Sequence, residues 1–116
     1  VGFWNPNKED LLRIRKEIEI DGQEFKRIIN QKKIKDIWGD IIGDEVKTSP
    51  KGFNSDHEHI DLIKKKQFIF IKKLKEKDIL DEKFQKELVN YFESIRPFFD
   101  YMSEVLTTNL DGESII

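Results

Sequence analysis

The sequence predicts an α+β fold that is predominantly helical, with about five or six helices, a small antiparallel sheet and a long, kinked helix at the C-terminal end. Apolar residues recur at helical spacings of three and four along most of the chain, whereas one short run, residues 68–71, is apolar on both faces, as in a buried strand. Turn residues gather between these segments. A length of 116 residues fits a single domain, 1–116, with one hydrophobic core.

The first third of the chain predicts a strand followed by three helices. Residues 1–4 are β-prone, and Asn5 is expected to cap a helix that starts at Pro6 and runs to about residue 20. Asp21 and Glu24 have the spacing of a capping box, which predicts a second, short helix. A third helix is expected to end at Gly39, a residue suited to a left-handed cap.

The middle of the chain predicts a loop, a helix and a strand. Turn residues dominate positions 40–54, with a short strand expected at 46–48. Ser55 and Glu58 have capping-box spacing and predict a helix that ends in lysines 64–66. Residues 67–74 are expected to form a strand that needs neighbours on both sides.

The last element is a long amphipathic helix that begins after Asp81. Its apolar seam is interrupted by Pro97, which removes a backbone hydrogen bond and predicts a kink or a break near Arg96. The apolar stripe is wider than a two-helix seam, which favours the core of its own domain over a coiled-coil dimer. The tail from Thr107 to Ile116 is expected to fray.

Composition excludes several classes of function. The 21 basic and 23 acidic side chains give a net charge of -2, so no overall field attracts nucleic acid or a membrane surface. Without cysteine there is no disulfide, thiolate nucleophile or zinc-thiolate site, and a cytoplasmic location fits best. The longest apolar run is far shorter than the roughly 20 residues that a membrane span requires, so we expect no membrane partner.

The tetrapeptide Asp56-His57-Glu58-His59 is the one cluster that resembles a metal or acid-base site. Two histidines at i and i+2 on a helix point in nearly opposite directions, and the chain offers no other histidine or cysteine as a third ligand. We therefore predict no metal site and no cofactor, and interpret these residues as turn and surface residues.

The stretch Lys64–Lys77 is rich in lysine and includes Phe68 and Phe70, as a nucleic-acid surface would. The lysines flank the apolar run rather than alternate with it, which is typical of solvated ends around a buried strand. Nucleic-acid binding is therefore the weakest of the functional alternatives.

Several segments stand in a specific order and spacing: Gly2-Phe3-Trp4-Asn5-Pro6, Leu12, Ile14-Arg15, Ile18, Pro50-Lys51-Gly52-Phe53, Asp56-His57, Lys66, Phe68, Phe84, Pro97 and Asp100-Tyr101. Together they resemble the C-terminal half of an uncharacterised bacterial and fungal family known as domain of unknown function 2461. Where this chain has Asn54 and Glu58, the family pattern has proline. The resemblance implies a protein of about twice this length whose N-terminal half supplies more strands, and it implies no established reaction.

These observations favour a structural or interaction portion of a larger protein, without a catalytic site of its own. The sequence has no phosphate loop, serine elbow, dinucleotide fingerprint or paired-carboxylate motif. The expected partners are the missing N-terminal half of the same protein and, as an alternative, a second copy. The alternative function is an enzyme or small-ligand binder whose pocket is completed by that half and includes Trp4, Arg15, Lys51, Asp56, His57 and Lys66.

Overall fold

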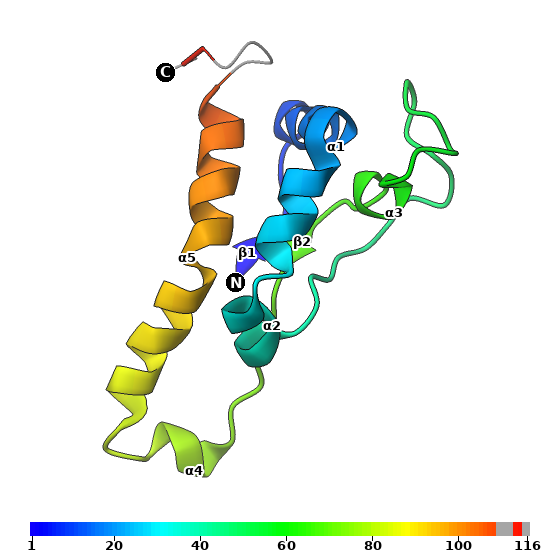
Figure 1. Ribbon diagram of the computed structural model, residues 1–116. Helices are drawn as coiled ribbons and strands as arrows, with labels where there is room; N and C mark the ends of the chain where they lie inside the picture. Colours follow the sequence, from blue (N-terminus) through cyan, green and yellow to red (C-terminus); the bar gives the residue numbers. More distant parts are fainter. Residues whose placement is uncertain (109–112, 115–116) are drawn as a thin grey trace.

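The computed structural model describes residues 1–108 and 113–114 and confirms the α+β fold, with five helices and a two-stranded antiparallel sheet in those residues. Helix α1 packs beside the C-terminal half of α5, and α3 lies on the side of α1 away from α5 (Figure 1). The elements in chain order are β1 (Gly2–Phe3), α1 (Lys8–Ile29), α2 (Lys32–Trp38), α3 (Ile60–Ile63), β2 (Phe68–Ile69), α4 (Glu76–Ile79) and α5 (Phe84–Thr107).

Helix α1 begins later than predicted and joins two predicted helices. Its cap is Asn7, whose side chain accepts the amide of Asp10, so the expectation that Asn5 caps a helix starting at Pro6 is wrong. The predicted break at Asp21 is present as a kink with non-helical backbone angles. The Asp21 carboxylate accepts the amide of Glu24 at 3.4 Å, which is half of the expected capping box.

Strand β2 is shorter than predicted but has neighbours on both sides. It pairs with β1 in the register Gly2 to Ile69 and Phe3 to Phe68. On its other side Ile69 exchanges two backbone hydrogen bonds with Ile42. The predicted strand at 46–48 is absent from the described residues, because in this loop only residues 42 and 45 form isolated bridges.

The structure also corrects the prediction for residues 55–66. Ser55 and Glu58 form no capping box; Asn54 instead accepts the amides of Asp56 and His57, and helix begins only at Ile60. Helix α2 ends at Gly39 as predicted, with a positive φ of 76° there. Helix α4 was not predicted.

Helix α5 runs through Pro97 as one helix, and Figure 1 shows its axis changing direction midway, so the predicted kink is present without a break. It ends at Thr107, and Thr108 forms an isolated bridge with Ser114. The rest of the predicted frayed tail lies outside the described residues.

The core fills the space between α1, the second half of α5 and the sheet. Phe98 is at its centre: its ring contacts those of Phe3, Phe25 and Phe70, with centroids 5.1 to 6.3 Å apart. Buried side chains of α1, α2, α3 and β2 join this cluster together with Phe53 and Phe70, whereas α4 contributes no buried residue.

Candidate functional site

Arg15 joins α1 to the end of α3. Its Nε donates to the carbonyl oxygen of Ile63 at 2.7 Å, and its Nη2 donates to that of Lys65 at 3.1 Å. These carbonyls follow the last turn of α3 and have no partner within the helix, so the guanidinium acts as a C-terminal cap from another element. Burial lowers the pKa of Arg15 from its ordinary value, although an arginine remains charged at neutral pH.

His57 is held between α1 and the turn before α3. The backbone amide of His59 donates to its Nδ1 at 3.0 Å, so Nδ1 carries no proton. The proton is therefore on Nε2, which donates to the carbonyl oxygen of Glu19 at 3.2 Å. Both ring nitrogens are thus engaged with the backbone of this chain.

His59 is buried, so its interpretation as a turn or surface residue in the sequence analysis is wrong. Its side chain is almost fully buried, and its ring lies directly against the backbone of Gly22. A Cβ atom at position 22 would lie 2.2 Å from the His59 Cδ2, so only glycine permits this packing. The Nε2 lies 3.2 Å from a carboxylate oxygen of Glu58, and the buried Nδ1 has no hydrogen-bond partner in the part of the chain that the structure describes.

Arg15, the carbonyl of Glu19 and, beyond the kink at Asp21, Gly22 all contact α3 or the turn before it. We call this contact, made by Arg15, Glu19 and Gly22 with His57 and His59, the α1–α3 clasp. The hydrogen-bond donors of Arg15 and His57 bind backbone carbonyls and so hold α3 and its preceding turn on α1. It contains no nucleophile next to a base, the arrangement that covalent catalysis needs.

The other candidate residues lie on the surface, outside the hydrogen bonds and ring contacts of the clasp. Lys51, Asp56 and Lys66 are exposed. Trp4 is half exposed and lies in a groove with Asn7 at the start of α1. The structure therefore places Arg15 and His57 in one interface, and brings Trp4 to a different part of α1.

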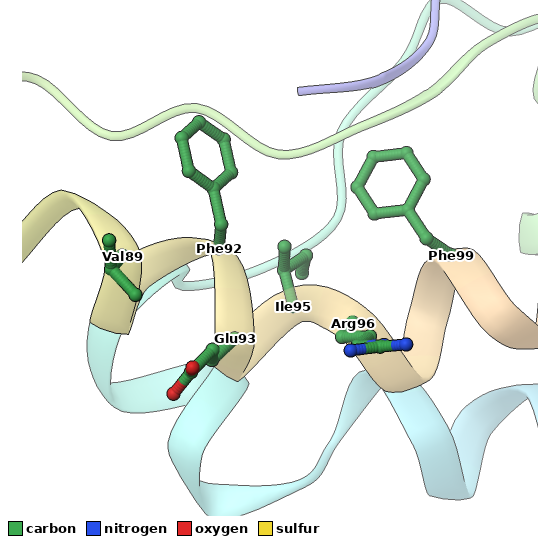
Figure 2. Close-up of a pocket in the computed structure, with 6 residues that line it drawn as sticks. All are labelled: Val89, Phe92, Glu93, Ile95, Arg96 and Phe99. Carbon is green, nitrogen blue, oxygen red and sulfur yellow. The ribbon is translucent and has the colours of Figure 1, made fainter.

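A second groove lies on α5 and is almost entirely apolar (Figure 2). The rings of Phe92 and Phe99 stand on one side of the helix, the carboxylate of Glu93 projects from the other, and the guanidinium of Arg96 lies between them. Val89 and Phe92 are about half exposed although they are large and apolar. Its lining residues are Val89, Phe92, Glu93, Ile95, Arg96 and Phe99.

Neither a metal centre nor a membrane span is found in the residues described. Among residues 1–108 and 113–114, no three histidine or carboxylate side chains are grouped so that they could hold a metal ion. No helix in the same residues is both long and apolar enough to cross a membrane.

Comparison with known proteins identifies a family. The model of the conserved hypothetical proteins DUF2461 matches residues 1–101. No curated protein and no solved structure matches the chain. Because the match covers most of the 116 residues and agrees with the resemblance in the sequence, the chain belongs to the DUF2461 family of conserved hypothetical proteins.

Proposed function

We propose that this chain is a non-catalytic interaction portion of a cytoplasmic protein, the C-terminal part of a longer polypeptide, and that it docks a helix on α5. The observation that carries the proposal is the exposure of apolar side chains in one region. Of the large apolar side chains that are exposed in the described residues, most lie between residues 71 and 92: Ile71, Ile79, Leu80, Val89 and Phe92. Such a concentration marks an interaction surface more often than a solvated one.

The shape of the α5 groove supports a helical occupant. Phe92, Ile95, Arg96 and Phe99 are spaced i, i+3, i+4 and i+7. Four residues with this spacing form the hole that receives one side chain of a partner helix in knobs-into-holes packing. An amphipathic helix would therefore cover Val89 and Phe92 while its polar edge meets Glu93 and Arg96.

The two expected sources of that helix are the N-terminal part of the same protein and a second copy of this chain. In either case the chain acts by assembly rather than by chemistry. The alternative pocket of six residues receives less support, because Arg15 and His57 donate their hydrogen bonds to backbone carbonyls.

Hydroxyl-radical footprinting inside cells that produce the protein tests whether the groove is covered. The oxidation of Phe92 in cells is compared with that in the dilute purified chain. Leu12 on α1 is the matched control, because its side chain is exposed to the same degree, 50% against 49% for Phe92. We expect at least about threefold protection of Phe92 in cells and none of Leu12, since a covered side chain loses contact with water. Equal oxidation of Phe92 in the two samples would overturn the proposal.

A further inference from the structure

We propose that a second copy of this chain occupies the α5 groove, with the two α5 helices packed antiparallel about a two-fold axis near Ser94. This inference rests on the proposed function and names the partner of the same surface. It is carried by the spacing and the charges of the stripe Val89, Phe92, Arg96 and Phe99, in which the first three residues are exposed and Phe99 is partly buried.

The stripe is symmetric along the helix. Its four residues are separated by three, four and three positions, so the spacing reads the same in both directions from Ser94. In an antiparallel pair centred there, Val89 lies opposite Phe99 of the second copy, and Phe92 lies opposite its Arg96. A two-fold interface requires one patch to complement itself, and this stripe meets that condition.

The side chains that would meet are chemically matched. Val89 against a phenylalanine buries two apolar groups. Arg96 is exposed and would lie against the ring of a phenylalanine, which is a favourable cation–π arrangement. Among the residues that the structure describes, its guanidinium has one long ion-pair contact, 3.7 Å, with the exposed Asp100, so little stability is lost when it turns to a partner.

Glu93 completes the match because it lines the same groove as Arg96 (Figure 2). In the antiparallel register, Glu93 of each copy lies about one residue along the axis from the position facing Arg96 of the other. The pair would therefore exchange two ion pairs at its edge. Such charges select the orientation of two helices more than they add affinity.

The stripe is short, so the pair is expected to be weak. Four side chains and their neighbours cover less than the roughly 800 Å² per partner that stable complexes bury. Association should therefore be seen at high protein concentration only, with dissociation constants on the order of 100 μM.

Sedimentation equilibrium of the purified chain from 10 to about 500 μM tests the proposal, with variants that reverse the two charges. We expect the weight-average mass to rise above 13.9 kDa toward twice that value. Arg96→Glu alone and Glu93→Arg alone should each weaken association at least tenfold, because each places like charges opposite one another. The double variant E93R/R96E should restore the two ion pairs and associate at least about threefold more tightly than either single variant, although it lacks the contact between Arg96 and the ring.

Lys86→Glu is the matched control, since Lys86 is an exposed charge on the same helix outside the stripe. It should leave the dissociation constant unchanged within about twofold. A monomer at every concentration, or a double variant no better than the single ones, overturns the second-copy assignment. If Phe92 is nevertheless protected in cells, the docking function stands and its occupant is another polypeptide. If Phe92 is also unprotected, both proposals fail.

Discussion

The two halves of α5 have the same proportion of apolar residues, but only the second half is packed against the core. Five of the ten residues from 84 to 93 are apolar, as are seven of the fourteen from 94 to 107. The first half contains no buried side chain, whereas the second buries Ser94, Ile95, Phe98, Met102 and Val105. Burial in this helix is therefore decided by what packs against each half and not by its composition.

The partners of the two halves explain the difference. The second half lies against α1 and the sheet, which supply Phe25 and Phe70. The first half extends with α4 away from these elements, as Figure 1 shows. Its contact with the body is made near its end, where the indole nitrogen of Trp38 in α2 donates to the Tyr91 carbonyl and the Ser94 hydroxyl. The first half of α5 therefore exposes apolar side chains that no other element buries, and such a surface is suited to binding a partner.

Truncating one phenylalanine in each half gives the largest expected contrast. Phe98→Ala removes a fully buried ring that contacts four others, and should lower the free energy of unfolding by about 3 to 5 kcal/mol. Phe92→Ala changes a half-exposed ring and should cost less than about 1 kcal/mol. Urea unfolding of dilute samples, followed by circular dichroism, measures both. Similar losses in the two variants would show that the first half is as much a part of the core as the second.

Gly22→Ala tests how tightly the body is packed, away from α5. Alanine favours a helix over glycine by about 1 kcal/mol, but here its Cβ would collide with the buried ring of His59. We expect a net loss of about 1 to 3 kcal/mol as the α1–α3 clasp is forced apart. The measurement is the urea midpoint, with the exposed neighbour Gln23→Ala as control. A Gly22→Ala protein more stable than the control would mean that His59 moves aside freely.

Much of this body could be predicted from local sequence, because the signals lie within a few residues. The run at Phe68 is apolar on both faces and is buried between two backbone neighbours. Gly39 ends α2, and Asp21 interrupts α1. In each case one side chain or one short run determines the backbone conformation directly.

The failures arose where two local signals compete or where the partner is distant in sequence. Asn5 and Asn7 are both acceptable caps, and Asn7 is used. Ser55 does not cap a helix, because the side chain and the carbonyl of Asn54 accept the amides of the next residues and form a turn there. The burial of His59 depends on a glycine 37 positions earlier, and a single sequence gives no signal for such a pairing. For the same reason the candidate pocket could not be assembled from residue types alone.

Tyr101→Phe gives the smallest effect at neutral pH and a larger one in alkali. The Tyr101 hydroxyl is buried in the second half of α5, with no hydrogen-bond partner in the described residues. Burial first, and then the negative charges of Glu17, Asp21 and Glu24, raise the pKa of Tyr101 above its ordinary value. At pH 7 the substitution should change stability by less than about 1 kcal/mol, because the hydroxyl makes no hydrogen bond that phenylalanine would lose.

The sign of the alkaline effect follows from proton binding. An unfolded tyrosine loses its proton near pH 10, whereas folded Tyr101 keeps its proton to higher pH, so the folded state binds more protons in that range. The contribution of Tyr101 to stability is thus complete below pH 10 and decreases as the pH rises further, by at most about 1.4 kcal/mol per pH unit. Tyr101→Phe lacks this loss, so between pH 10 and 11.5 it should become more stable than the unchanged protein. Urea unfolding at pH 7, 9, 10.5 and 11.5 compares the two, and the titration of lysines is common to both. Parallel pH profiles would mean that water reaches the hydroxyl, and that the second half of α5 is packed as loosely as the first.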